Sequence, residues 1–317
     1  MQRPRPIIVS GTHKSGSTWV GNMICRQTDI VYLHEPFSPL RPTCACGGRF
    51  DRWFTYVTPE NESRFLGHIR STLSLSCPLR NTLKGLASGK HPWQTCVEAA
   101  YLLKHRLTPG STRALMKDPI ALFSLDWLAG RFGADIVVLI RHPAAFVNSI
   151  LRAGWTIPYA DLLAQPALLA GPLATYAEAI EFHASYEQPV LDQAILFWNM
   201  AHQRILDYQT AQPDWIYVRH EDLTQSPLEE FRQIYARLSI PFGEPSIEAI
   251  REYTRGRPPV RSERDAGADD GYYRRDSRAV HRQWLSQLTA AQIDRIKAET
   301  DPLWRSFYAG ADWQPVV

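Results

Sequence analysis

Near-continuous apolar runs alternate with helix-like patterns along most of this chain. Four of these runs predict β-strands: "PIIVS" (6–10), "RALMK" (113–117), "DIVVLIR" (135–141) and "WIYVRH" (215–220). Three of them lack the strict polar alternation of a half-exposed strand, which is typical of parallel strands buried on both faces. The pattern therefore predicts an α/β protein with a central parallel sheet.

Apolar residues recur at helical spacing between the runs. Helices are expected at 17–27, 120–132, 143–152, 189–209 and 226–238. The last of these begins with Ser226 as a plausible N-cap, Pro227 at the first helical position and Glu229 completing a capping box. Strands that alternate with helices predict right-handed β-α-β units, and so an α/β/α arrangement of three layers.

Three stretches depart from this alternation. Residues 36–110 and 153–188 each follow a strand–helix unit, at the sheet edge where α/β proteins bind ligands. We interpret both as insertions that line an acceptor site. Residues 255–278 are rich in charge, Gly and Pro, which predicts a loop rather than core. The whole chain, residues 1–317, is expected to form one domain.

The composition is that of an ordinary globular protein, with 44% hydrophobic and 21% charged residues. The formal net charge of +3 suits anionic small molecules but is too small to indicate nucleic-acid binding. No apolar stretch approaches the roughly 20 residues that cross a bilayer, and the first apolar run begins at Pro6, too early for a signal peptide. We expect a soluble, cytoplasmic protein.

The cysteines are odd in number: Cys25, Cys44, Cys46, Cys77 and Cys96. An odd set favours reduced thiols over a disulfide framework. The Cys-x-Cys pair and its distant partners match no common zinc spacing, so no structural metal is expected.

The stretch "GTHKSGST" (11–18) joins the first strand to the first helix and has the spacing of a P-loop. Such a turn directs backbone N–H groups and the positive end of a helix at one point, which makes an anion site. The alternative is a plain connection in which Gly11 and Gly16 only satisfy backbone geometry. Ser17 stands where P-loop nucleotidases carry lysine, and the loop's lysine is Lys14.

Metal-dependent nucleotide chemistry also needs an acidic residue at the end of a second strand. The strand "DIVVLI" ends instead in Arg141, His142 and Pro143. We therefore expect no metal. A lysine such as Lys14 can stabilise the oxyanion of a leaving group without one.

Two segments carry a resemblance to a known family. "HKSGSTW" (13–19) resembles the 5′-phosphosulfate loop of the sulfotransferases that use 3′-phosphoadenosine 5′-phosphosulfate (PAPS), and "RHPAAFVNSILR" (141–152) resembles their 3′-phosphate signature. "YVRHEDL" (217–223) and "RDSRAVHRQWLSQL" (275–288) are similar to later landmarks of the family. The resemblance implies a P-loop-like fold and metal-independent transfer of a sulfuryl group from PAPS to a hydroxyl, with release of PAP.

The resemblance also implies a set of cofactor-binding residues. They are His13, Lys14, Ser15, Gly16, Ser17, Thr18, Trp19, Arg141, Ser149, His220, Arg275 and Arg278. Lys14 would contact the bridging oxygen of the leaving phosphate, and Arg141 and Ser149 would bind the 3′-phosphate. Trp19 would lie against the adenine, or else be a buried aromatic residue at the start of the helix.

Two parts of this set have open alternatives. His220 stands where relatives often carry Tyr near the adenine, so a structural histidine is equally consistent. Arg275 and Arg278 both lie in the 255–278 region, where one of them would reach the 3′-phosphate as part of a lid. The alternative for both arginines is a solvated run of charge.

The acceptor hydroxyl must lose a proton, so a general base is needed. The candidates are His13, His34, Glu35 and His68. "YLHEPFSPL" (32–40) resembles a segment of carbohydrate sulfotransferases in which a glutamate is thought to act as the base. Glu35 is therefore the expected catalytic base, with His34 next; a Glu35 that only caps the turn before Pro36 is the alternative.

The same segment favours a carbohydrate or glycosylated acceptor over a phenolic or lipid alcohol. The rival functions are a P-loop kinase, which would need Mg²⁺, and a non-catalytic PAP-binding protein, for which an intact Lys14 would be unnecessary. The acceptor's identity and the oligomeric state, monomer or homodimer, are left open by the sequence.

Overall fold

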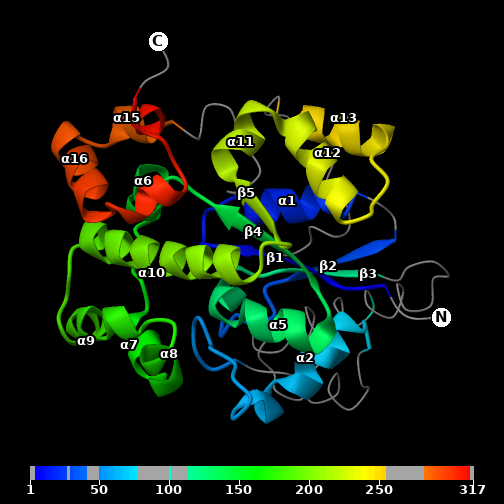
Figure 1. Ribbon diagram of the computed structural model, residues 1–317, viewed down its shortest axis with the longest axis horizontal. Helices are drawn as coiled ribbons and strands as arrows, with labels where there is room; N and C mark the ends of the chain where they lie inside the picture. The colour runs from blue at the N-terminus through cyan, green and yellow to red at the C-terminus, as the bar shows by residue number, and fades with distance from the viewer. Residues whose placement is uncertain are drawn as a thin grey trace. The chain divides into compact units, whose positions relative to one another are not determined.

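The computed structural model describes residues 4–26, 29–40, 50–76, 100, 113–254 and 282–314. In this part of the chain, five strands form a single parallel sheet in the order β2-β3-β1-β4-β5 (Figure 1). The strands are β1 (Ile7–Gly11), β2 (Ile30–His34), β3 (Arg113–Lys117), β4 (Asp135–Ile140) and β5 (Ile216–Arg219). Helices flank the sheet, and the α/β class expected from the sequence is confirmed.

The predicted strands are present with small shifts of their ends, and β2 is an addition. Its sequence "IVYLH" is a short apolar run that the pattern analysis did not assign. β2 pairs with β3 in parallel register, with Ile30 opposite Arg113 and His34 opposite Lys117. The last predicted strand is shorter than expected, because His220 already belongs to the helix that follows β5.

The described residues fall into two compact units. The first comprises the chain up to residue 10 together with 17–137, and the second comprises 11–16 and the residues from 138 onward. The assignment of residues 1–317 to one domain stays a prediction.

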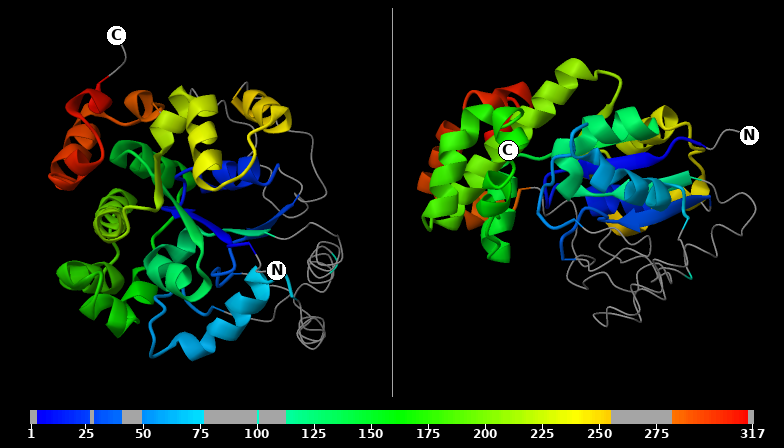
Figure 2. Two further views of the ribbon diagram at one scale, coloured as in Figure 1. Left: turned by 45° about the vertical axis from the view of Figure 1, so that its right-hand side comes forward. Right: turned by 90° about the horizontal axis from the view of Figure 1, so that it is seen from below.

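In the first unit, one helix covers one face of the strands and two lie on the other side (Figures 1 and 2). The covering helix is α1 (Ser17–Ile24), and the opposite side carries α2 (Leu66–Leu73) and α5 (Leu125–Phe132). The short 3-10 helices η1 (Glu62–Arg64) and η2 (Pro119–Ser124) precede α2 and α5. Glu62 links η1 to α5, because its carboxylate accepts hydrogen bonds from Trp127 Nε1 at 2.8 Å and Arg131 Nε at 2.7 Å.

The second unit is mainly helical. Its elements are α6 (Pro143–Ala153), α7 (Tyr159–Leu163), α8 (Pro166–Ala170), η3 (Ala174–Tyr176), α9 (Ala177–Ser185), α10 (Val190–Ala211), α11 (His220–Gln225), α12 (Pro227–Arg237), α13 (Glu244–Thr254), α15 (Trp284–Gln287), α16 (Ala290–Glu299), η6 (Leu303–Ser306) and η7 (Gly310–Trp313). The long helix α10 and helices α15 and α16 all pack against α6. Through these contacts α6 has a large buried face, which fixes the turn between β4 and α6.

The stretches expected to be insertions or loops are described in part. Residues 153–188 form the short helices α7, α8 and α9, in which α7 packs against α9. Of residues 36–110, the turn after β2 and the η1–α2 segment are described. Residues 255–278 and four of the cysteines (Cys44, Cys46, Cys77 and Cys96) lie outside the described residues, and Cys25 is buried.

The expected capping box of α12 does not form. Pro227 is the first helical residue, as predicted, but Ser226 makes no side-chain capping bond. Its φ of −131° and ψ of 58° depart from the extended conformation usual for N-cap residues. Glu229 instead pairs with Arg232 one turn along the same helix.

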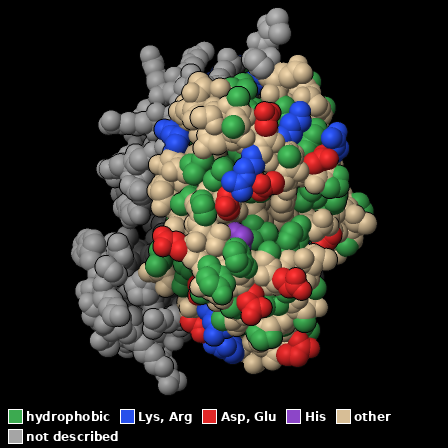
Figure 3. Space-filling model, turned by 90° about the vertical axis from the view of Figure 1, so that its left-hand side faces the viewer, with side chains coloured by type: hydrophobic (Ala, Val, Ile, Leu, Met, Phe, Trp, Pro, Cys, Tyr) green, Lys and Arg blue, Asp and Glu red, His purple; other side chains and the backbone are tan. Residues whose placement is uncertain are grey.

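Figure 3 shows the face of the molecule that carries α9, α10 and α16. Acidic and basic side chains are interspersed there among apolar ones, with no large field of one sign among the atoms described on this face. Within the described ranges, no helix has the length and apolarity needed to span a membrane.

Candidate functional site

The loop after β1, residues 11–16, requires glycine at both of its glycine positions. Gly11 has φ of 138°, and a Cβ there would lie 2.4 Å from the carbonyl oxygen of Leu139. Gly16 has φ of 93°, and a Cβ there would lie 2.5 Å from Nδ1 of His220. The loop therefore packs against the end of β4 and the start of α11 at distances that only glycine permits.

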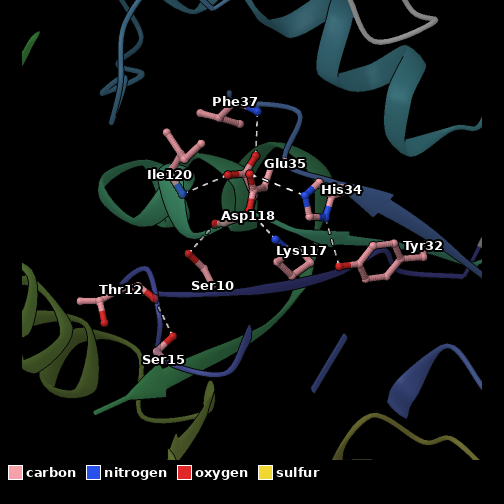
Figure 4. A network of polar contacts seen from close by, with 10 residues as sticks. All are labelled: Ser10, Thr12, Ser15, Tyr32, His34, Glu35, Phe37, Lys117, Asp118 and Ile120. Atoms are coloured by element: carbon pink, nitrogen blue, oxygen red, sulfur yellow. Dashed lines mark hydrogen bonds and ion pairs between the residues drawn. The ribbon is translucent and has the colours of Figure 1, made fainter. Parts of the chain in front are cut away.

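Three further features indicate that this loop is more than a connection. Lys14 adopts the left-handed conformation with φ of 62°, which costs energy in a residue other than glycine and often occurs at functional sites. Ser15 bonds back to the carbonyl of Thr12, through its N–H at 3.3 Å and its hydroxyl at 2.6 Å (Figure 4). The buried hydroxyl of Thr12 has no hydrogen-bond partner among the described residues, which fits a loop shaped to receive a ligand.

Arg141 directly follows β4 and is only 5% exposed. Its carbonyl accepts a hydrogen bond from Trp198 Nε1 at 2.9 Å, and its N–H points to Nε2 of His202 at 3.4 Å. Burial lowers the pKa of His202 to about 3, so the ring is neutral and can accept. The backbone of Arg141 is thus held by α10, while Ser149 lies partly exposed on α6.

The residue after Arg141 is held by a buried carboxylate. The N–H of His142 donates to Oε1 of Glu221 at 3.2 Å, and the hydroxyl of Tyr308 donates to Oε2 of the same residue at 2.8 Å. Burial raises the pKa of Glu221, and the charge of Arg141 works in the opposite direction. The ring of His142 stacks on Trp284 with centroids 5.0 Å apart, and burial lowers its pKa to about 3.

His13 is part of the loop, and His220 packs against it at Gly16. His220 is buried, with its ring at Gly16 as described above. The ring of His13 packs edge-on against Trp155, with centroids 4.6 Å apart. The structure therefore brings His220 into contact with the loop. Arg141 and Ser149 belong to the same compact unit as the loop.

A second polar group lies in the first unit, around Glu35 (Figure 4). Glu35 follows β2, has φ of 47°, and donates its N–H to the carbonyl of Lys117 at 2.9 Å. Its carboxylate pairs with the ammonium of Lys117, a side chain that is 2% exposed. His34 Nε2 lies 3.7 Å from the other carboxylate oxygen, and its Nδ1 lies 3.3 Å from the hydroxyl of Tyr32.

The residue directly after β3 is Asp118, which changes the interpretation of the strand ends. The expectation that no carboxylate is placed to bind a metal rested on the residues after β4, whereas Asp118 follows β3, the strand hydrogen-bonded to β1. Both of its oxygens are occupied, by the N–H of Phe37 at 2.7 Å and that of Ile120 at 3.0 Å. Burial, and then the charge of Glu35, raise the pKa of Asp118 to about 7. Two backbone N–H groups therefore hold this carboxyl in place.

The remaining expected cofactor-binding residues lie on α1 or outside the described residues. Ser17 and Thr18 form the first turn of α1, and Trp19 is a buried residue of that helix with 3% exposure. Its burial matches the alternative of a core aromatic residue, and its contact with adenine stays a prediction. Arg275 and Arg278 lie outside the described residues. No group of three or more His, Cys, Asp or Glu side chains among the described residues could hold a metal ion.

Sequence reasoning missed Lys117, Asp118, Glu221 and Tyr308. A usable signal existed for the first two, since "RALMKDP" ends a buried strand in charged residues just as "DIVVLIRHP" does. Polar residues at the carboxyl ends of parallel strands meet at one edge of a sheet. Tyr308 offered no such signal, because its contact with Glu221 joins positions far apart in the chain.

Comparisons with known proteins identify the class. The family model described as "Sulfotransferase family" matches residues 6–244, which is well over half of the chain. The chain therefore belongs to the sulfotransferase family. No curated protein matches its sequence significantly.

One solved structure agrees on the fold. The chain is similar to the sulfotransferase domain of the Synechococcus PCC 7002 olefin synthase, at 18% identity and a TM-score of 0.52, with 98% of this chain and 97% of that one covered. This similarity confirms the expected P-loop-like fold. A lower similarity is found to mouse sulfotransferase SULT7A1 complexed with PAP, at 13% identity and a TM-score of 0.48, covering 96% and 86%.

Proposed function

We propose that this sulfotransferase takes its sulfuryl group from PAPS and transfers it to a hydroxyl of a carbohydrate or glycosylated acceptor, without a metal. The observation that carries the proposal is the loop of residues 11–16, whose glycines pack against β4 and His220 and whose Lys14 is left-handed. A loop of this kind at the start of a helix suits the 5′-phosphosulfate. The buried cation Arg141, in the same compact unit, suits a second phosphate.

The residues have distinct roles in this proposal. His13, Lys14, Ser15, Gly16, Ser17 and Thr18 hold the 5′-phosphosulfate, Arg141 and Ser149 hold the 3′-phosphate, and Trp19 and His220 lie near the adenine; Arg275 and Arg278 complete the set. Lys14 contacts the bridging oxygen, where negative charge develops as the bond from that oxygen to sulfur breaks. The acceptor oxygen forms the new bond to sulfur on the opposite side.

Glu35 is the proposed base that takes the acceptor's proton. The ion pair with Lys117 holds the carboxylate, and the hydrogen bond from the Glu35 N–H to the carbonyl of Lys117 holds the backbone. The positive φ of Glu35 is the kind of backbone strain that is often found at active sites. His34, at 3.7 Å from the carboxylate, is the alternative base. A glutamate base is what favours a carbohydrate acceptor over a phenolic or lipid alcohol.

Calorimetric titration tests the donor. PAP should bind with micromolar-class affinity in the absence of Mg²⁺, and Arg141→Ala should weaken that binding roughly tenfold or more, since hydrogen bonds to charged groups contribute about 1.5–3 kcal/mol. Arg232→Ala removes the same charge from an exposed ion pair on α12 and should bind PAP as the wild type does.

Turnover separates the enzyme from a PAP-binding protein. With labelled PAPS and a panel of sugars, phenols and lipid alcohols, the wild type should label one class, and Lys14→Ala should slow the transfer by about 10²-fold. ATP binding that appears only with Mg²⁺ would assign the loop to a kinase. PAP binding with no labelled product from any class would leave a binding protein.

A further inference from the structure

Glu221 lies where three separate parts of the second unit meet. It is in the first turn of α11, and its carboxylate accepts from the N–H of His142 after β4 and from the hydroxyl of Tyr308 near the C-terminus. The residue is only 6% exposed. Two donors on two different oxygens hold this carboxylate in a single orientation.

The hydrogen bond from His142 holds the peptide next to Arg141. Oε1 of Glu221 accepts from the N–H of His142 at 3.2 Å, and this N–H belongs to the peptide that joins Arg141 to His142. Burial raises the pKa of Glu221, and the charge of Arg141 lowers it. The contact therefore fixes the backbone from which the Arg141 side chain extends.

The C-terminal contact is itself supported from two directions. The guanidinium of Arg219 lies over the ring of Tyr308, 4.5 Å from its centroid, and also pairs with Asp312 at 3.3 Å. The ring of Tyr308 packs edge-on against His142, with centroids 4.9 Å apart. The η6–η7 segment is therefore tied to the same strand end as Glu221.

We infer that Glu221, completed by Tyr308, is a positioning residue for the 3′-phosphate: its two hydrogen bonds fix the Arg141–His142 turn and so the place of Arg141. This inference rests on the proposed function, in which Arg141 binds that phosphate. It assigns Glu221 no contact with the nucleotide. Its loss should therefore weaken only the part of binding that depends on the 3′-phosphate.

The experiment compares the affinities of PAP and AMP, which differ by the 3′-phosphate alone, in the purified full chain. Glu221→Ala should lower the ratio of the PAP affinity to the AMP affinity about tenfold, with the AMP affinity changed less than about twofold. Glu221→Gln should retain most of the ratio, because an amide can accept from His142 and donate to Tyr308. Tyr308→Phe removes one hydroxyl and should lower the ratio by a smaller factor.

Two further variants test specificity. Thr300→Val removes another buried hydroxyl, one that donates to the carbonyl of Ile296 at 2.7 Å, and should leave the ratio unchanged. In an Arg141→Ala background, Glu221→Ala should change the ratio no further, since the two act on one phosphate.

The outcomes distinguish this inference from the function on which it rests. A wild type that prefers PAP, with the preference intact in Glu221→Ala or with PAP and AMP weakened equally, would overturn the positioning role alone. A wild type that binds PAP no better than AMP would overturn the proposed function and this inference together. Tyr308→Phe keeps the ring, so its ratio remains measurable should Glu221→Ala fail to fold.

Discussion

Gly16 meets two constraints at once, one from its own backbone and one from a neighbour. Its φ of 93° is strained for any residue with a Cβ, and the ring of His220 occupies the space that the Cβ would need. A shift of the His220 ring would make room for a Cβ at Gly16, but the strained φ would remain. The loop's shape therefore depends on the absence of a single methyl group.

Gly16→Ala should weaken PAP binding more than tenfold, because the loop must shift to clear His220 and the backbone N–H groups move with it. Gly130→Ala is the matched control: it adds the same methyl group within α5, where nothing lies within 4 Å. Calorimetry should show wild-type affinity for Gly130→Ala. Equal affinities in the two variants would mean that the loop does not bind the nucleotide.

Asp118 makes the stability of the fold depend on pH. Its carboxyl takes up a proton near pH 7 in the native state and near 3.8 in the unfolded state. The native state therefore binds more protons between these values, and the contribution to the free energy of unfolding falls as the pH rises from about 4 to about 7. The loss is at most about 4 kcal/mol.

Asp118→Asn should remove this slope. Urea unfolding of both proteins at several pH values between 4.5 and 8 gives the difference in their free energies of unfolding. That difference should favour the wild type most at low pH and shrink as the pH rises. The buried His142 and His202, whose lowered pKa values act in the opposite sense, cancel in the comparison. A difference that stays constant with pH would contradict the assignment.

At the scale of elements, the sequence predicted most of the strands but not the side-chain pairs that join separate elements. The apolar runs of β1, β3, β4 and β5 are long enough to recognise, whereas β2 is five residues that end in a partly exposed histidine. The loop and Arg141 were predicted because each belongs to a contiguous motif. The pairs Glu35–Lys117 and Glu221–Tyr308 were not, because they join separate elements and no local pattern encodes them.

Helix N-termini with a hydroxyl residue at the N-cap also differ in ways that the sequence does not show. Thr289 forms a complete capping box with Gln292 at the start of α16, while Ser226 forms none at the start of α12. Thr289→Ala should therefore lower the free energy of unfolding by about 1 kcal/mol, and Ser226→Ala by a few tenths. Thermal or urea unfolding measures both, and a cost at Ser226 as large as that at Thr289 would show that its hydroxyl does cap α12 in solution.

At the scale of the whole molecule, the chain alternates between its two compact units. Residues 11–16 belong with Arg141 and His220, whereas the flanking β1 residues and α1 belong with Glu35 and Lys117. The sequence predicted one domain, because each segment taken alone fits a single β-α-β pattern. Which residues cluster into which unit depends on packing that the pattern does not specify.

Hydrogen exchange should follow this division. PAP at a hundredfold excess over its dissociation constant adds about 2.7 kcal/mol to stability. Protection should rise at residues 11–16, around Arg141 and in α11, whereas α2 and α5 of the first unit should keep their exchange rates. Mass spectrometry of peptides from the bound and free protein measures this. Protection confined to α2 and α5 would place the nucleotide elsewhere.

The contact between Tyr308 and Glu221 also bears on how the protein is made. A ribosome synthesises the loop and Glu221 well before Tyr308, so the hydroxyl that completes the Glu221 contact is missing until residue 308 has been added. A nascent chain that carries the loop, β4 and α11 still lacks one of the two donors to this carboxylate. Full discrimination between nucleotides with and without a 3′-phosphate would then be acquired only after residue 308 has been added and has folded onto α11.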